Sequence, residues 1–248
     1  DRNDAYLEVH SGSGGTEANN TIIRGAGDPA LPVLLGEVEH ASTIDAAGNR
    51  GVVLWSVDAE GAVEVRKPER AVGLIALTHG QNEVGTIQPV EAAADLARSL
   101  GVPFHLDASQ TLGRVPLEAA IDVADTVALS THKAGGIRGM GLLVVRDAAA
   151  LTQPLLAGGG LERGLRAGTP NPALAAATAW SVQLAVEETT ERAQQMRLAR
   201  DTVWNALRST GCQRIGSADG LPNTLMVCFP GIEGRILLPA LDIAGIEV

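Results

Sequence analysis

The segment Thr126-Val127-Ala128-Leu129-Ser130-Thr131-His132-Lys133 decides the fold expected of this chain. Its first four residues form a short apolar run typical of a buried parallel strand, and the polar residues that end in Lys133 follow where that strand would stop. Gly135 and Gly136 then break the chain. The pattern therefore predicts a lysine held at the carboxyl end of a strand.

Two segments nearer the N-terminus share this arrangement. Residues 102–106 predict another buried strand, which is followed by Asp107 and then by Gln110. Gly14-Gly15-Thr16 is a glycine-rich turn that opens a predicted helix, and its backbone amides would bind an anion. Such a turn is equally typical of a plain loop, and it matches neither the Walker A nor the GxGxxG pattern.

Strand-like and helix-like runs alternate through the first two thirds of the chain. Val52–Trp55 and residues 72–77 predict buried strands, whereas Val90–Leu100 has apolar residues at helical spacing. This alternation predicts an α/β fold with a mostly parallel sheet covered on both faces. Ligands of such sheets bind beyond the carboxyl ends of the strands, which is where Asp107 and Lys133 fall.

The pattern changes after residue 170. An alanine-rich helix is predicted at 173–186, a charged amphipathic helix at 187–207, a strand at 224–229 and a last helix near 237–241. We therefore interpret residues 1–170 as a large domain and residues 171–248 as a smaller C-terminal α/β lobe. The chain starts without Met and stops in mid-pattern at Val248, so we expect both domains to be incomplete.

Composition narrows the class of protein. The 248 residues carry a formal net charge of −10 with a pI of about 4.9, which argues against a general nucleic-acid surface. Cys212 and Cys228 show no zinc-ligand or disulfide spacing, so no metal site and a reducing compartment are expected. Without a run of about 18 apolar residues or a signal-peptide pattern at Asp1 to Asp4, the sequence predicts a soluble cytoplasmic protein.

A lysine, an aspartate and an anion-binding turn at the ends of separate strands together suit pyridoxal 5′-phosphate. Lys133 would form an imine with the cofactor, Asp107 would keep the ring nitrogen protonated, and the glycine-rich turn would hold the phosphate. Each residue also has a plainer interpretation. Lys133 could be a solvated surface residue, and Asp107 could be a helix N-cap.

Two more residues are candidates for the same site. His40, in Glu39-His40-Ala41-Ser42, could lie flat on a cofactor ring, although a histidine before a helix is more often a cap or a core residue. Asn82 follows a predicted strand and could donate to a phenolate, but an asparagine before Gly85 is equally typical of a turn.

The ordered set of motifs resembles the cysteine desulfurases, in class V of the aminotransferase superfamily. The resemblance covers essentially the whole chain and implies fold type I of the pyridoxal-phosphate-dependent transferases. It is carried by Gly14-Gly15-Thr16-Glu17-Ala18-Asn19-Asn20, Glu39-His40-Ala41-Ser42, Asn82-Glu83-Val84-Gly85-Thr86, His105-Leu106-Asp107-Ala108-Ser109-Gln110, Ser130-Thr131-His132-Lys133, residues 158–169 and Leu221-Pro222-Asn223-Thr224.

The resemblance implies a role for each site residue. Lys133 would carry the cofactor, His40 would stack on its ring, and Asp107 would pair with the ring nitrogen. Asn82 and Gln110 would bond the phenolic oxygen. The phosphate would be held by Gly15, Thr16, Ser130 and His132, together with Thr169 from the partner subunit of a homodimer that shares its active sites.

This sequence departs from the family pattern in three places. The family carries an Asn-Ala-Ala-Thr-Thr-like segment well before the glycine-rich turn, and a loop with the nucleophilic cysteine and then a carboxylate-binding arginine after a stretch like residues 241–246. None of these is present here. Cys212 and Cys228 lie elsewhere and are expected to be structural, and Thr131 replaces a residue that is usually Gly or Ala.

The leading hypothesis is a desulfurase that converts L-cysteine to L-alanine and passes persulfide sulfur to an acceptor protein. That acceptor could be an iron–sulfur scaffold, a tRNA-modifying enzyme or part of a natural-product pathway. Another class V lyase or aminotransferase, and a cofactor-holding scaffold without catalysis, remain alternatives. A nicotinamide-dependent dehydrogenase is less consistent with the glycine spacing, and it leaves Lys133 and Asp107 unexplained.

Overall fold

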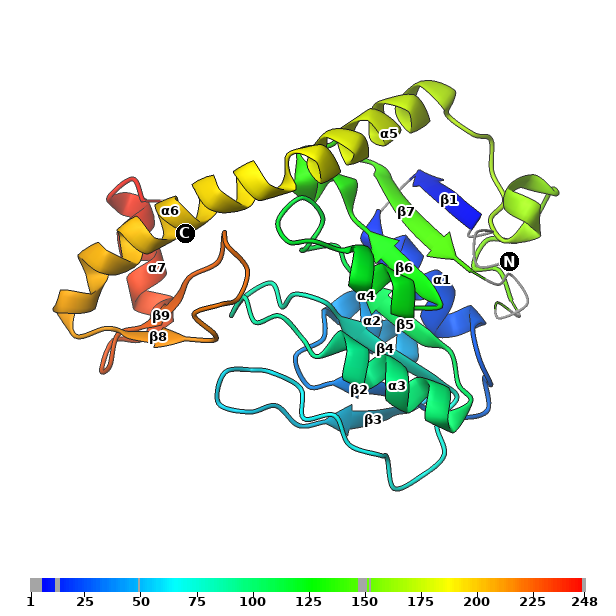
Figure 1. Ribbon diagram of the computed structural model, residues 1–248, viewed down its shortest axis with the longest axis horizontal. Coiled ribbons are helices and arrows are strands. Elements are labelled where there is room, and N and C mark those ends of the chain that lie inside the picture. Colours follow the sequence, from blue (N-terminus) through cyan, green and yellow to red (C-terminus); the bar gives the residue numbers. More distant parts are fainter. Residues whose placement is uncertain (1–5, 12–13, 49, 147–150, 152, 247–248) are drawn as a thin grey trace.

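The structure, a computed structural model, describes residues 6–11, 14–48, 50–146, 151 and 153–246, and for residues 6–11 it describes the backbone. The expectations that the chain has no signal peptide and that it stops in mid-pattern concern Asp1 to Asp4 and Val248. These residues lie outside the described part of the chain. A seven-stranded sheet in the order β1-β7-β6-β5-β4-β2-β3 forms the centre of the molecule (Figure 1). The strands are β1 (Tyr6–Ser11), β2 (Val33–Gly36), β3 (Val52–Trp55), β4 (Leu74–Thr78), β5 (Phe104–Asp107), β6 (Thr126–Leu129) and β7 (Met140–Val145).

The sheet is mostly parallel, as the sequence predicts. Strands β3, β2, β4, β5 and β6 pair in parallel, whereas β7 runs antiparallel to both β6 and β1. The strand order changes direction between β2 and β4. Strand β3 pairs with one edge of β2, and the next strand in the chain, β4, pairs with the other edge. Strands β4, β5 and β6 are buried along their whole length and mostly apolar, with Thr78, Asp107 and Thr126 at their ends and His105 inside β5.

Helices cover both faces of the sheet. In Figure 1, α3 and α4 lie in front of the sheet and α1 and α2 behind it. Successive strand residues point to opposite faces, so Leu34 packs in the core on the α3 side, whereas Val33 and Leu35 pack on the α1 side. The helices are α1 (Gly15–Gly25), α2 (Ala41–Ala47), α3 (Val90–Leu100) and α4 (Glu118–Val123), and the 3-10 helix η1 (Thr131–Ala134) follows β6.

A long helical arm leads from the sheet to a second group of elements. The helices α5 (Pro172–Glu187) and α6 (Thr189–Leu207) carry the chain to the antiparallel pair β8 (Gln213–Ile215) and β9 (Met226–Cys228) and to α7 (Gly234–Ile243) (Figure 1). The 3-10 helices η3 (Leu161–Gly164) and η4 (Arg208–Thr210) precede and follow this arm. Ala185 of α5 is fully buried in the core of the large sheet. The boundary after residue 170 stays a prediction.

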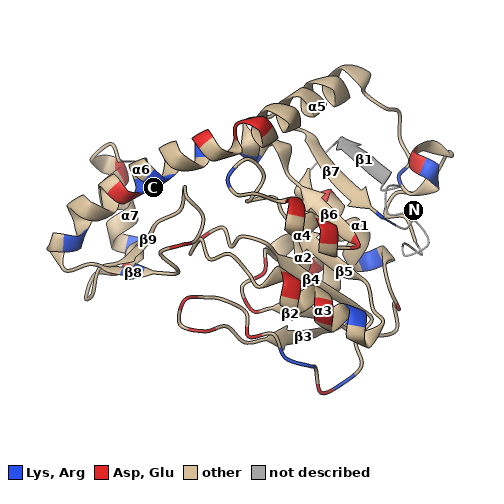
Figure 2. Cartoon of the chain, viewed as in Figure 1, with Lys and Arg blue, Asp and Glu red and all other residues tan. Residues whose placement is uncertain are grey.

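Helix α5 is apolar around its circumference and nearly free of charged residues (Figure 2). Trp180 is 62% exposed and Val186 is 51% exposed on its surface. Among the described residues, no helix is both long enough and apolar enough to cross a bilayer.

The core can be tested at Leu106, which is fully buried in the central strand β5. We expect Leu106→Ala to lower the free energy of unfolding by about 2–5 kcal/mol, because it leaves a cavity in a close-packed layer. Leu54→Ala is the matched control, since Leu54 is 52% exposed on β3 and its truncation should change the value by roughly 0.5 kcal/mol or less. Chemical denaturation monitored by circular dichroism measures both, and equal losses would contradict this core assignment.

Candidate active site

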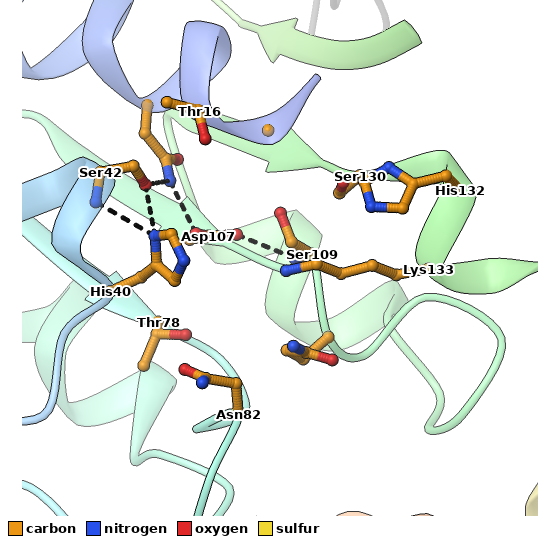
Figure 3. A pocket seen from close by; sticks show the side chains of 13 residues that line it. Thr16, His40, Ser42, Thr78, Asn82, Asp107, Ser109, Ser130, His132 and Lys133 are labelled. Atoms are coloured by element: carbon orange, nitrogen blue, oxygen red, sulfur yellow. Dashed lines mark hydrogen bonds between the residues drawn. The ribbon is translucent and has the colours of Figure 1, made fainter. Parts of the chain in front are cut away.

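A polar pocket of about 210 Å³ opens at the carboxyl ends of the parallel strands. It lies beside the point where the strand order changes direction, which is the usual ligand site of such sheets. Every site residue predicted from the sequence lines this pocket except Thr169 (Figure 3). The lining residues are Gly15, Thr16, Asn19, His40, Ser42, Thr78, Asn82, Asp107, Ser109, Gln110, Ser130, His132 and Lys133.

One wall of the pocket is an anion-binding cup. Helix α1 begins at Gly15, and its first two residues, Gly15 and Thr16, line the pocket, which brings the positive end of the helix to this wall. A Cβ atom on Gly15 would lie 2.8 Å from Oγ of Ser109, so the close approach requires glycine. Ser130 is buried after β6, and its Oγ lies 3.2 Å from Nδ1 of His132. Burial and the nearby positive charges of Lys133 and Arg138 lower the pKa of His132.

Asp107 ends β5 at the floor of the pocket and is 7% exposed. Its Oδ1 accepts from the backbone N–H of Ser109 at 2.9 Å, and its Oδ2 accepts from Nδ2 of Asn19 at 2.7 Å. The residues directly after Asp107 form turns, and the next described helix begins at Glu118, so the helix N-cap alternative for Asp107 is wrong. The two donors stabilise the ionised carboxylate, which still has acceptor capacity toward the pocket.

His40 is both a helix cap and a pocket residue. It precedes α2, and its Nδ1 accepts from the backbone N–H of Ser42 at 3.1 Å. Oγ of Ser42 lies 2.8 Å from the same nitrogen, so the hydroxyl donates to it. With Nδ1 occupied as an acceptor, the neutral ring carries its proton on Nε2. The imidazole extends into the pocket beside Asp107 in Figure 3.

Lys133 enters the pocket from the wall opposite His40, and its side chain extends toward Ser109 and Asp107 (Figure 3). Its backbone is fixed by Arg114, whose Nη2 donates to the carbonyl of Lys133 at 2.8 Å. The Nη1 group of Arg114 donates to Oε1 of Gln110. Burial lowers the pKa of Arg114. Arg114, which the sequence analysis missed, therefore holds two of the predicted residues in place.

Asn82 lies in a turn after β4. Oε1 of Gln81 accepts from the backbone N–H groups of Glu83 and Val84 at 2.6 and 2.7 Å, which shapes this turn. The backbone N–H of Leu221 donates to the carbonyl of Gly85 at 2.7 Å, and Leu221 is fully buried. The Leu221-Pro222-Asn223-Thr224 motif therefore holds the turn that carries Asn82 through this bond to Gly85.

The comparisons with known proteins agree with this architecture. The profile of the family described as "Aminotransferase class-V" matches residues 8–248. An IscS-like cysteine desulfurase of Mycobacterium tuberculosis is 34% identical over 97% of this chain and 67% of its own length. A cysteine desulfurase of Cereibacter sphaeroides is 35% identical over 99% of this chain and 66% of its own length. The chain belongs to the class V aminotransferase family.

A solved structure named as a NifS-like protein superposes with a TM-score of 0.86 at 30% sequence identity, covering 98% of this chain and 70% of the other. The match confirms the expected fold type I architecture. This class V chain spans between 62% and 68% of the length of the curated relatives that we compared.

The class V family is dependent on pyridoxal phosphate, and the residues of this pocket fit that cofactor. The α1 amides, Ser130 and His132 are a donor set for a phosphate group. Ser109 has a buried Oγ without a hydrogen-bond partner among the described residues, as expected where a ligand supplies the acceptor. An anion-binding cup, a carboxylate and an amine around one small pocket match the phosphate, ring nitrogen and aldehyde of the cofactor.

Thr169 does not reach the pocket in this chain. It is exposed in the segment between η3 and α5. Arg166 in the same segment forms a mostly buried ion pair with Glu17 of α1, with Nε and Oε1 2.9 Å apart. The role of Thr169 in a partner subunit, like the roles of the residues that do line the pocket, stays a prediction.

The two cysteines are free and lie outside the pocket. Cys212 is buried, and Cys228 is exposed on β9. Within the part of the chain that the structure describes, no three His, Cys, Asp or Glu side chains form a group that could bind a metal ion.

Several residues that matter to the pocket were not predicted from the sequence. Their signal was weak because each is a common polar residue inside a helix, strand or turn. The structure shows that four line the pocket and that three support it from behind: Asn19, Ser42, Thr78 and Ser109 in the first group, and Glu39, His105 and Arg114 in the second.

Glu39 is the most perturbed carboxyl group near the site. Its Oε1 accepts from the backbone N–H of Thr78 at 2.7 Å, whereas Oε2 is buried without a partner among the described residues. Burial raises the pKa of Glu39 from 4.5 to about 8, although the Thr78 bond lowers it, and the charge of Asp107 adds to the increase. The side chain is therefore protonated and neutral at neutral pH.

This protonation predicts a pH dependence of stability. Between pH 4.5 and about 8 the unfolded chain loses the Glu39 proton while the folded chain keeps it, so the free energy of unfolding should fall as the pH rises through this window. Glu39→Gln cannot ionise and should remove that part of the slope. Exposed Glu60→Gln is the control and should keep the wild-type slope. Urea unfolding at several pH values tests this, and parallel wild-type and Glu39→Gln curves would contradict it.

Proposed function

We propose that this protein is a pyridoxal-phosphate-dependent cysteine desulfurase. The observation that carries the proposal is the convergence of Lys133, Asp107 and His40 on one pocket with an anion-binding cup. The names of the relatives support the choice of substrate, since proteins about one third identical to this chain are cysteine desulfurases. The substrate would be L-cysteine, and the products would be L-alanine and sulfur carried as a persulfide.

Each residue has a proposed role in holding the cofactor. Lys133 would bind it covalently, Asp107 would hold its ring nitrogen, and His40 would lie against its ring. Asn82 and Gln110 would bond its phenolic oxygen. The phosphate would be held by Gly15, Thr16, Ser130 and His132, and by Thr169 of a second subunit. Bound pyridoxal phosphate supplies an electron sink for the carbon next to the amino group.

Two proton transfers are assigned to Lys133. Its amine removes the proton from the α carbon of cysteine, and it later returns a proton to the carbon that loses sulfur. Between these steps a thiolate attacks the sulfur of the substrate, a sulfur–sulfur bond forms, and the carbon–sulfur bond breaks. The balance is L-cysteine plus a thiol giving L-alanine plus a persulfide. Arg114 holds the backbone carbonyl of Lys133 during these transfers, and the same guanidinium donates to the side chain of Gln110.

The attacking thiol is not among the pocket residues. Cys212 is buried and Cys228 lies on β9, and neither lines the pocket. We propose that it belongs to a cysteine on a segment outside the sequence described here. If no such cysteine exists, the same pocket favours another class V reaction, a lyase or aminotransferase acting on a different amino acid. A cofactor-holding scaffold without catalysis is the remaining alternative.

The proposal includes a homodimer with shared active sites. Thr169 is exposed and lies away from its own pocket, and the apolar surface of α5 around Trp180 and Val186 is available for burial. The free cysteines support a reducing, cytoplasmic compartment as part of the same proposal. The sulfur acceptor is proposed to be a protein, such as an iron–sulfur assembly scaffold or a tRNA-modifying enzyme.

The first test is Lys133→Ala. The purified protein incubated with pyridoxal phosphate should show the visible absorbance of a lysine-linked cofactor, and the variant should lose it together with all alanine formation, because the linking amine is gone. Arg138→Ala is the control, since Arg138 is a neighbouring exposed cation outside the pocket lining. Survival of the same absorbance in Lys133→Ala would refute the assignment.

The second test concerns the thiol. Cys228→Ser should leave the rates of alanine and sulfide formation from L-cysteine within about twofold of wild type, because Cys228 is exposed on β9 away from the pocket. Mass spectrometry of the persulfide formed on the protein locates the accepting sulfur directly. A persulfide on Cys228, or loss of activity in the variant, would assign the nucleophile to this residue. Cofactor binding without any alanine product would favour the two rival functions.

A further inference from the structure

A buried chain of hydrogen bonds runs beneath the pocket and joins two of its walls. Its centre is Asn19, in the first turns of α1, which is 1% exposed. Nδ2 of Asn19 donates to Oδ2 of Asp107 at 2.7 Å and to Oγ of Ser42 at 2.9 Å. Oδ1 of Asn19 lies 3.1 Å from Nε2 of His105. One amide group therefore contacts three side chains.

The directions of these bonds follow from the donors available. An ionised Asp107 can only accept, so the amide nitrogen of Asn19 must face it, and the amide oxygen must face His105. Nε2 of His105 therefore carries a proton and donates to that oxygen. Nδ1 of His105, 2.8 Å from Oγ1 of Thr126, is left to accept from the hydroxyl.

Burial keeps His105 in this neutral form. The residue is 1% exposed, and burial lowers its pKa from 6.5 to about 4, although the charge of Asp107 and a contact with the Thr126 backbone raise it. The other tautomer, with the proton on Nδ1, would turn Nε2 into an acceptor. Asn19 would then have to turn its amide and present its oxygen to the carboxylate, which is repulsive. His105 thus stabilises the orientation of Asn19 that the Asp107 carboxylate requires.

The same amide reaches His40 through Ser42. The hydroxyl of Ser42 accepts from Asn19 and donates to Nδ1 of His40, at 2.9 and 2.8 Å. The series Thr126, His105, Asn19, Ser42 and His40 therefore has one consistent donor direction, with a branch from Asn19 to Asp107. Figure 3 shows the dashed bonds that connect the His40 side of the pocket with Asp107.

We propose that Asn19 is a positioning residue, supported by His105, that fixes Asp107 and His40 relative to each other, one at the nitrogen of the cofactor ring and the other on the ring face. The inference rests on the proposed function, because the ring nitrogen and the ring face are what these two residues would contact. Asn19 would keep the Asp107 carboxylate aimed at the ring nitrogen, and would hold the plane of His40 through Ser42. Such supporting contacts hold the groups that touch the cofactor in one geometry.

The test compares two buried histidines, of which only one has a hydrogen bond to Asn19. His105 contacts Asn19, whereas His79 does not. His79 is 7% exposed, its Nδ1 lies 3.1 Å from Oγ1 of Thr111, and burial lowers its pKa to about 4 in the same way. His79→Leu is therefore a matched control for His105→Leu, because both remove a buried imidazole bonded to a threonine.

Asn19→Leu and His105→Leu should weaken binding of added pyridoxal phosphate about tenfold, the loss expected for a hydrogen bond to a charged group. They should also shift the pH dependence of the visible absorbance of the bound cofactor, because Asp107 is no longer held on the ring nitrogen. His105→Gln can still donate to Asn19 and should restore the wild-type titration. His79→Leu should match wild type in both measurements. The ionisable groups that face this network are Asp107, His40, Lys133, Glu39 and His105 itself.

Nitrogen NMR of the imidazoles in cofactor-free protein separates this inference from the proposed function. His105 should be neutral with its proton on Nε2 at neutral pH. If wild type binds the cofactor but Asn19→Leu and His105→Leu titrate like His79→Leu, or if His105 is in the other tautomer, the positioning role is overturned. If His105 has the expected tautomer but wild type binds no pyridoxal phosphate, the proposed function fails and the role falls with it.

Discussion

The carboxylate of Asp107 is the group on which the rest of the site depends. It ends the central strand β5 and is nearly buried, so its charge needs donors. Ser109 supplies a backbone N–H and Asn19 a side-chain amide, one to each oxygen. Because Asn19 also binds Ser42 and His105, satisfying this one charge fixes helix α1, helix α2 and strand β5 relative to one another.

The pocket is a consequence of the sheet. Strands β2, β4, β5 and β6 run in parallel and end at the same edge, so the residues that follow them meet there although they are far apart in sequence. The change of strand order between β2 and β4 leaves the crevice that the polar side chains line. Behind it, Glu39 and Arg114 each fix a backbone segment at this edge: Glu39 the last residue of β4, and Arg114 a residue of η1.

In the proposed mechanism the pocket residues form a rigid part of the site, whereas the attacking thiol comes from outside the pocket. In the proposed function the pocket residues would bind and orient the cofactor and move protons, and hydrogen bonds hold them in place. A sulfur transfer needs in addition a thiol that can approach the substrate and then present its persulfide to an acceptor. A residue fixed in the sheet or in the core, as Cys212 is, could not do both, so a rigid pocket and a separate thiol are compatible parts of one mechanism.

The sequence by itself determined the α/β class, the bounds of β3 and β6 and most of the pocket residues, because strand runs, glycine breaks and the motifs around Lys133 and Asp107 are local patterns. Helix α3 was predicted with its observed bounds for the same reason. Only the tertiary structure revealed Asn19, Glu39, His105 and Arg114, since their importance comes from burial and from partners on other elements. Tautomers and shifted pKa values arise when the fold removes a group from water, and no pattern along the chain encodes that.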